Sequence, residues 1–334
     1  MSLLERARTT ITDPPRTIVF PEGEDPVVQA AAVALAATAL VRPVLVGAPP
    51  TFAGRLAPYV ADPDGCVVAA AREDPRCSRY AASYAARADL PMGAAELITG
   101  RPLVFAAMMV AAGDAHGMVA GIANPTEDVI AASRLAIGAR DDGTVPCSVY
   151  LLDLPGRVSQ EGSMLALADP AMNPRPDPAE LAGIAVAAAG AVRDMLGWEP
   201  RVALLSFSTH GSADDPAVDL VRTACDLLRE QDVSFAFDGE VQLDAAVDER
   251  IAQRKLGGSS PVAGRANVLV FPNLDAANIG AKLLQHFAGA TAYGPILLGL
   301  DGPVSDLSRG ARLDDVVGTA LLVAGLPARR RPAP

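Results

Sequence analysis

Short β-rich runs alternate with helical segments along the whole chain, and this order constrains the fold more than any other feature. Thr17 to Phe20 is a β-rich run, and Asp25 then stands as a helix N-cap with Pro26 at the first helical position. We expect that helix to run over 26–39, and Arg42-Pro43 to separate it from a strand over 44–46. Strands separated by helices pair in parallel, so the order predicts an α/β fold with a mostly parallel sheet.

A second helix start carries a stronger signal. Asp177, Pro178 and Glu180 combine an N-cap, a first-turn proline and a reciprocal acid, so we expect a helix over 178–196 that Gly197 ends. The alternation then continues to the end of the chain. We expect a helix from about Asp215-Pro216, a strand over 267–271, a helix over 276–287 and a final helix from 314 to about 324.

The loop over 208–212 follows an expected strand at 201–207 and precedes the helix that begins near Asp215. Its residues Ser208, Thr209 and Ser212 place hydroxyl groups around Gly211. A hydroxyl-rich glycine loop before a helix N-terminus can bind an anion through its N–H and O–H donors. Ordinary helix capping is the alternative interpretation of the same residues.

Length and charge limit the number of domains and the class of partner. At 334 residues the chain exceeds the size at which a single core stops growing, which favours two domains that share a cleft. A formal net charge of −11 repels nucleic acid and anionic membranes, so we expect neither as a partner. An anionic substrate must then be bound by local basic groups.

The four cysteines, Cys66, Cys77, Cys147 and Cys225, are scattered and show no spacing typical of a zinc site. We therefore expect reduced thiols and no bound metal. The N-terminal segment lacks the apolar core of a signal peptide, and apolar helical runs such as 30–41 fall short of the roughly 20 residues that cross a bilayer. A cytoplasmic location is the expectation.

The segment over 294–310 is mostly apolar up to the turn Ser308-Arg309-Gly310. Arginine offers a planar fork of donors to a phosphoryl group, serine adds a hydroxyl, and glycine lets backbone N–H groups approach closely. An ordinary surface turn is the alternative for such a triplet taken alone.

Several further sequence blocks precede this turn along the chain. They are FPEGED at 20–25, FAAMMV at 105–110, GMVAG at 117–121, MNPRP at 172–176, SFSTHGS at 206–212, DGEVQLDAA at 238–246 and SPVAGRANVLVFPNLDAANIG at 260–280. With PVSDLSRG at 303–310, they resemble the phosphate acetyltransferase and butyryltransferase family. The resemblance extends from about Phe20 to about Val323.

The resemblance implies two α/β domains that flank an active-site cleft, as in isocitrate and isopropylmalate dehydrogenases, with one domain discontinuous. The first domain would comprise 1–146 plus 295–334, and the second 147–294. Members of the family form homodimers in acetate metabolism and transfer an acyl group reversibly between coenzyme A and inorganic phosphate. Coenzyme A is thus expected as a substrate, with no tightly bound cofactor.

The resemblance also assigns roles to individual residues. Asp315 would be the base that accepts the proton of the coenzyme A thiol, while Arg309 and Ser308 would stabilise charge on the phosphate or the reacting carbonyl. Asp315 could instead serve only as a partner of the helix dipole. The further substrate-binding residues expected from the resemblance and the two loops are Arg87, Arg134, Ser208, Thr209, Ser212, His286 and Gly310.

The chain departs from the usual family pattern at three positions. Ala131 stands where an arginine is common, with Arg134 close behind it, and His286 replaces another arginine. Ser305 replaces the usual asparagine. Loss of two guanidinium groups would weaken anion binding.

Three functions follow from these observations. The first is a phosphate acetyltransferase, and the second is a relative that transfers a propanoyl or butanoyl group. The third is a catalytically weak regulatory or oligomerising domain, like the related region of some malic enzymes. Such a domain would tolerate loss of Ser308, Arg309 and Asp315, yet all three are present. A hydride-transferring dehydrogenase is disfavoured because the chain has no GxGxxG element.

Overall fold

The computed structural model describes residues 3–11, 15–47, 67–69, 71–258 and 260–327, so Cys66 lies outside the described residues. The chain divides into two compact units. Unit 1 comprises Met1–Arg140 and Leu300–Pro334, and unit 2 comprises Asp141–Gly299. Unit 1 is therefore built from two separate stretches of the chain, whereas unit 2 is one continuous stretch.

Unit 1 contains a parallel sheet with helices on both faces. Its strands are β1 (Arg16–Phe20), β2 (Val41–Val46), β3 (Val67–Ala69), β4 (Gly117–Ala120) and β11 (Val304–Asp306), in the spatial order β3-β2-β1-β4-β11. Its helices are α1 (Leu3–Thr10), α2 (Pro26–Ala36), α4 (Arg76–Ala88), α5 (Met92–Thr99), α6 (Pro102–Ala112), α7 (Thr126–Ala136) and α13 (Leu313–Gly325). The C-terminal stretch thus supplies a strand and a covering helix to this unit.

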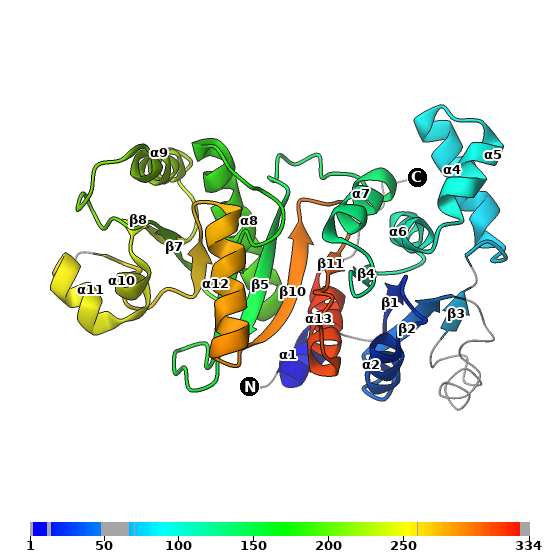
Figure 1. Cartoon of the computed structure of the whole chain (residues 1–334), viewed down its shortest axis with the longest axis horizontal. Coiled ribbons are helices and arrows are strands. Elements are labelled where there is room, and N and C mark those ends of the chain that lie inside the picture. The colour runs from blue at the N-terminus through cyan, green and yellow to red at the C-terminus, as the bar shows by residue number, and fades with distance from the viewer. Residues whose placement is uncertain (1–2, 12–14, 48–66, 70, 259, 328–334) are drawn as a thin grey trace. The chain divides into compact units, whose positions relative to one another are not determined.

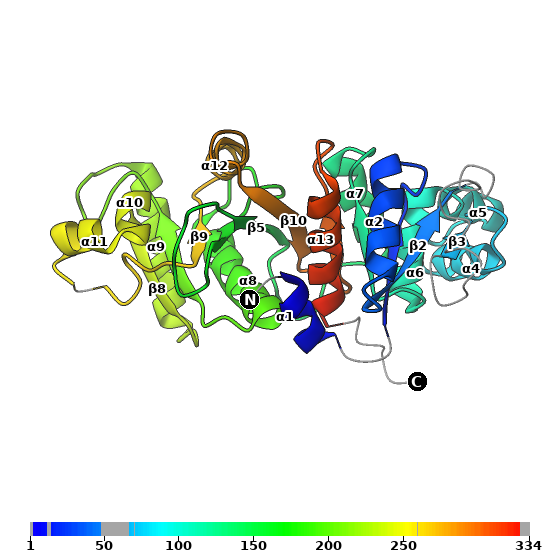
Figure 2. The same ribbon diagram turned by 90° about the horizontal axis from the view of Figure 1, so that it is seen from below.

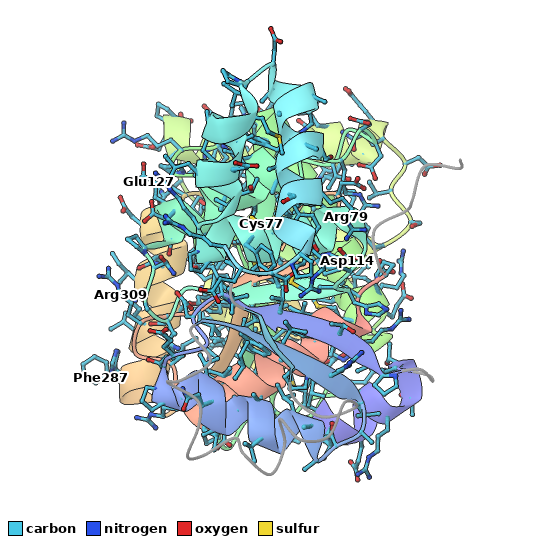
Figure 3. All side chains as sticks on the ribbon, turned by 90° about the vertical axis from the view of Figure 1, so that its right-hand side faces the viewer. Cys77, Arg79, Asp114, Glu127, Phe287 and Arg309 are labelled. Carbon is cyan, nitrogen blue, oxygen red and sulfur yellow. The ribbon has the colours of Figure 1, made fainter. Side chains whose placement is uncertain are left out.

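The helices of unit 1 bury its sheet from both sides. Figures 1 and 2 show α2 and α13 on one face and α6 and α7 on the other. Phe20 and Phe105 are fully buried, and the ring of Tyr80 lies 5.3 Å from that of Phe105. Figure 3 shows Arg79 of α4 beside Asp114, with which it forms an ion pair. This packing holds β4 and β11, the two strands whose carboxyl ends lead into the candidate site.

Unit 2 contains a mixed sheet. Its strands are β5 (Cys147–Asp153), β6 (Met164–Ala168), β7 (Arg201–Leu205), β8 (Ala236–Val241), β9 (Val268–Val270) and β10 (Thr291–Leu298), in the order β10-β5-β6-β9-β7-β8. The pairs β10–β5 and β5–β6 are antiparallel, and the remaining pairs are parallel. Its helices are α8 (Pro178–Leu196), α9 (Pro216–Glu230), α10 (Leu243–Val247), α11 (Glu249–Leu256) and α12 (Leu274–Phe287).

Helices α8 and α12 lie on opposite faces of the sheet of unit 2 (Figures 1 and 2). The core is made of small aliphatic side chains, as the low aromatic content requires. Leu152, Leu167 and Leu269 belong to one buried cluster with Ala281 of α12, a helix in which Ala277 is buried as well.

The mostly parallel α/β fold predicted from the sequence is confirmed, and so are the capped helices. Asp25 accepts hydrogen bonds from Val27 N and Val28 N, and the Asp177–Glu180 capping box begins α8, which Gly197 ends with φ +63°. The expected break at Arg42-Pro43 is wrong, because both residues lie inside β2. β3 pairs only with residues from Val44 onward, so the missing N–H of Pro43 falls outside that ladder.

No single helix among the described residues is long and apolar enough to span a membrane. One bent pair, α5 and α6 at 100°, reaches the required length and composition together.

Candidate active site

The Ser308-Arg309-Gly310 turn begins directly after β11. Leu307 N–H donates to Ala120 O, which ties the start of the turn to the end of β4. Ser308 is half-buried, whereas Arg309 and Gly310 are exposed. The buried strand therefore presents a short exposed turn at its carboxyl end, where the chemistry of parallel sheets is generally found.

Local hydrogen bonds hold the turn. Ser308 Oγ accepts from Gly310 N at 3.3 Å, and Ser308 O accepts from Ala311 N at 2.9 Å. Because the Oγ accepts from the backbone, its own hydrogen is available to donate to a ligand. The Arg309 guanidinium forms no hydrogen bond or ion pair with any described residue, and Figure 3 shows it at the left edge of the view.

Asp315 lies in the first turn of α13, which follows the Ser308 turn. Its Oδ2 accepts from Arg312 N at 2.8 Å, and the side chain is half-buried. The carboxylate thus stabilises the start of the helix, as an acid in this position commonly does. The structure places Asp315 seven residues after Ser308, on the helix that packs against β11.

A carboxylate that the sequence did not single out organises the loop after β4. Glu22 accepts hydrogen bonds from the backbone N–H groups of residues 121–124 at 2.8 to 3.0 Å, and from Asn124 Nδ2 at 2.7 Å. Such a series of N–H groups is a typical anion-binding arrangement, which the protein fills with its own side chain. The sequence feature that includes Glu22 is the FPEGED block. That block does not indicate that Glu22 contacts residues about a hundred positions away.

Asp306, the last residue of β11, lies beside this loop. It is buried, and its Oδ2 accepts from Thr126 Oγ1 at 2.6 Å. Burial raises the pKa of Asp306 to about 6, against the effect of the Thr126 hydrogen bond and with a contribution from the nearby Glu22 charge. Sequence reasoning missed Asp306 as well.

Arg87 and Arg134 lie near the other end of α7. Arg87 donates to Leu135 O at 2.7 Å and to Ala136 O at 3.1 Å, so it caps the C-terminal carbonyls of that helix. Arg134 is exposed in the last turn and makes no hydrogen bond or ion pair with the described residues. It follows Thr126 by eight residues, which is about 12 Å along a helix axis.

In unit 2, the loop with Ser208, Thr209 and Ser212 encloses another buried acid. Ser208 Oγ donates to Glu240 at 2.9 Å, and Gly211 N donates to the same carboxylate at 2.8 Å. Thr209 N donates to Ser212 Oγ at 2.9 Å. The donors of the expected anion cradle are therefore largely engaged within the protein, and a role for these residues in substrate binding stays a prediction.

Glu240 also contacts Arg222, whose Nε lies 3.2 Å from Oε2. Although burial opposes ionisation, hydrogen bonds from Arg222, Gly211 and Ser208 lower the pKa of Glu240 to about 2. Next to this group, His210 Nε2 lies 2.9 Å from Asp238 Oδ1. The pairs Arg222–Glu240 and His210–Asp238 thus lie at the loop, and composition and spacing did not reveal them.

His286 lies in the last turn of α12 and is exposed, and its contact with an anion stays a prediction.

The described residues also bear on metal binding and on the state of the cysteines. Among the described residues, no group of three or more His, Cys, Asp or Glu side chains could hold a metal ion. Cys77, Cys147 and Cys225 are free and buried.

Comparison with known proteins gives consistent results. Residues 2–324 match the family described as phosphate acetyl/butaryl transferase. A phosphate acetyltransferase of Paracoccus denitrificans is 38% identical over 97% of this chain and 99% of its own. One from Thermoanaerobacterium thermosaccharolyticum is 45% identical over 64% of this chain and 65% of its own. The crystal structure of a phosphotransacetylase from Streptococcus pyogenes superimposes with a TM-score of 0.86 and 32% identity, covering 97% of this chain and 98% of the other.

Proposed function

Since this chain belongs to the phosphate acetyl/butaryl transferase family, we propose that it is a phosphate acetyltransferase, which transfers an acetyl group reversibly between coenzyme A and inorganic phosphate. The observation that carries the proposal is the turn after β11. It combines the half-buried hydroxyl of Ser308 with the Arg309 guanidinium, which has no partner among the described residues. An anion is the natural ligand of that pair.

In the proposed reaction, the coenzyme A sulfur attacks the carbonyl carbon of acetyl phosphate. A bond forms between the sulfur and the carbonyl carbon. The bond between that carbon and the bridging oxygen breaks, and inorganic phosphate leaves with the electron pair of the broken bond. Asp315 accepts the thiol proton, because the thiolate is the reactive nucleophile and an unperturbed thiol is mostly protonated at pH 7. No acyl-enzyme is needed.

Arg309 binds two phosphate oxygens with its fork of donors and stabilises the charge that grows on the leaving group. Ser308 donates its free hydroxyl hydrogen to the same oxygens, and Gly310 allows the backbone to approach them. Arg134, Arg87 and His286 are proposed as further contacts to anionic parts of the substrates. For Arg87, this requires release of the two α7 carbonyls that it now caps.

The reaction needs only its two substrates, so we propose coenzyme A as a substrate and no tightly bound cofactor. Turnover should survive extensive dialysis against EDTA. We also propose that the enzyme is cytoplasmic.

We further propose a homodimer, which is supported by an exposed apolar stripe on α12. Ile279, Leu283 and Phe287 are spaced four residues apart on this helix and are 57%, 51% and 86% exposed. Light scattering should give twice the monomer mass for the wild type and a lower mass for Phe287→Glu.

One assay tests the proposed function. Purified protein is incubated with coenzyme A and acetyl, propanoyl or butanoyl phosphate, and thioester formation and thiol loss are followed together. Fastest turnover of acetyl phosphate supports the proposal, whereas a preference for a longer chain would reassign the acyl group. Absence of turnover on all three, in protein with a native circular dichroism spectrum, would contradict it in favour of a regulatory role.

A further inference from the structure

Asp306 has an unusual environment for an acidic residue. It is 2% exposed, and its Oδ2 accepts one hydrogen bond, from Thr126 Oγ1 at 2.6 Å. Its Oδ1 is buried and has no hydrogen-bond partner among the described residues. A buried carboxylate oxygen without a donor is costly to keep charged, so this position favours a proton on the side chain.

The nearest backbone donors cannot satisfy that oxygen. A Cβ on Gly121, which has φ +108°, would lie 2.2 Å from Asp306 Oδ1 and 2.6 Å from Leu307 N, so these groups converge on one point. Leu307 N–H already donates to Ala120 O, and Gly121 N–H donates to Glu22 at 2.9 Å. The tight packing at Gly121 therefore leaves Oδ1 without a donor.

Glu22 adds a negative charge next to Asp306. It accepts five hydrogen bonds through its two oxygens, which is the pattern of an ionised carboxylate. Together with burial, this charge raises the pKa of Asp306 to about 6. The proton on Asp306 is thus exchangeable near neutral pH.

The helices packed against β11 carry acidic side chains in their first turns. Helix α7 carries Glu127 and Asp128 in its exposed first turn, and α13 carries Asp314 and Asp315 in its first turn. Strand β4, with the sequence GMVA, carries none. None of these charges affects the Asp306 pKa as Glu22 does.

We propose that Asp306 couples proton uptake to anion binding, so that it takes up a proton when phosphate or the phosphate group of acetyl phosphate binds at the Ser308-Arg309 turn. This inference rests on the proposed function, because that function brings an anion to the turn. Ser308 follows Asp306 by two residues, so their Cα atoms are at most about 7.6 Å apart. A negative charge brought to this turn acts on the buried carboxyl two residues before it and destabilises the ionised form of that carboxyl.

Linkage requires the reverse effect as well. If anion binding favours protonated Asp306, ionisation of Asp306 must weaken anion binding by the same factor. We expect the affinity for the dianion to fall about three- to tenfold between pH 5 and 8, since a pKa change of half a unit to one unit corresponds to that factor. Asp306 acts here as a positioning residue that tunes the charge beneath the turn and does not touch the substrate.

Isothermal titration calorimetry with inorganic phosphate tests the coupling. The titration is carried out at pH 6.5 in buffers of different ionisation enthalpy, and the slope gives the number of protons taken up. Asp306→Asn is the central variant, because asparagine has the shape of the neutral acid and can still accept from Thr126. The exposed Asp314→Asn is the matched control. The ionisation of phosphate itself contributes equally to every titration. The proton uptake is therefore compared between the proteins and not taken as an absolute value.

We expect the wild type and Asp314→Asn to take up several tenths of a proton more than Asp306→Asn. Thr126→Val removes the hydroxyl that stabilises the ionised form, so the pH of maximal uptake should move upward in that variant. If Asp306→Asn does not fold, the Thr126→Val variant tests the coupling in its place. Equal proton uptake in wild type and Asp306→Asn, with phosphate binding and acyl transfer intact, would overturn the inference and leave the proposed function standing. A wild type that neither binds phosphate nor transfers an acyl group would overturn both.

Discussion

The hydroxyl of Ser208 donates a hydrogen bond to the carboxylate of Glu240 at 2.9 Å. The loop whose residue types suit a foreign anion is therefore folded around an anion of the protein itself. In unit 1, Glu22 does the same for the loop after β4. By contrast, the turn after β11 keeps a guanidinium without a partner among the described residues, and this difference directs the catalytic proposal to Arg309.

Arg309→Lys should lower turnover at least about tenfold, because lysine keeps the charge but loses the planar fork that binds two phosphate oxygens. Steady-state kinetics with acetyl phosphate measure the effect. Arg312→Lys, an exposed arginine three residues away, serves as the control and should stay within about twofold of the wild type. Near-normal kinetics for Arg309→Lys would remove Arg309 from its assigned role.

Asp315→Asn should depress kcat far more than it weakens coenzyme A binding, and should flatten the acidic limb of the pH profile. Asparagine can still accept the hydrogen bond from Arg312 N, so the start of α13 should survive while the base is lost. Thermal unfolding is measured alongside. If stability drops while turnover of the folded protein is unchanged, Asp315 is only a helix-end residue.

Glu240→Gln should destabilise the protein by about 1–3 kcal/mol at pH 7, because it breaks a buried, charge-assisted network. The pKa of Glu240 is lowered to about 2, so its stabilising contribution is complete above pH 4.5 and is lost as pH falls toward 2. Denaturant unfolding between pH 2.5 and 7 should show a shallower acid loss in the variant. Asp219→Asn removes an exposed partner of the same Arg222 and should change stability by less than about 0.5 kcal/mol.

Asp306→Asn should have the opposite effect on stability. The pKa of Asp306 in the fold is raised from 3.8 to about 6, so the wild type loses stability as pH rises through that interval. The variant should be more stable by about 1–3 kcal/mol at pH 7.5 and similar to the wild type near pH 3.5. Urea unfolding at both pH values measures the free energy of unfolding of the two proteins. A variant less stable than the wild type at pH 7.5 would show that the fold stabilises the ionised form of Asp306.

His286→Arg should tighten binding of acetyl phosphate and remove part of its pH dependence. Imidazoles as a class exchange a proton in the physiological pH range, whereas a guanidinium is always charged. The Michaelis constant is measured from pH 6 to 8 in both proteins, where ionisation of the substrate and of Asp306 is common to the two. Parallel curves would mean that His286 is a surface residue without contact to the anion.

The helix starts were predictable because their causes are local. Asp25 with Pro26 and Asp177 with Glu180 place a capping side chain within three residues of the N–H groups that it satisfies. These neighbours favour a helix start at that place largely independently of the tertiary fold. The boundary at Arg42-Pro43 failed for the opposite reason, since tolerance of Pro43 depends on which strands lie beside β2.

The features of the candidate site likewise fall into those set by local sequence and those set by tertiary contacts. The amino-acid sequence by itself determined the Ser308-Arg309-Gly310 turn, the helix start at Asp315 and the family resemblance, since all of these are matters of residue type and short-range order. Only the tertiary structure decided that Glu22 fills the loop at 121–124 and that Thr126 meets Asp306 across 180 residues. The charge state of a buried acid depends on desolvation and on neighbours brought by other strands, and neither quantity is encoded in the residues adjacent to it.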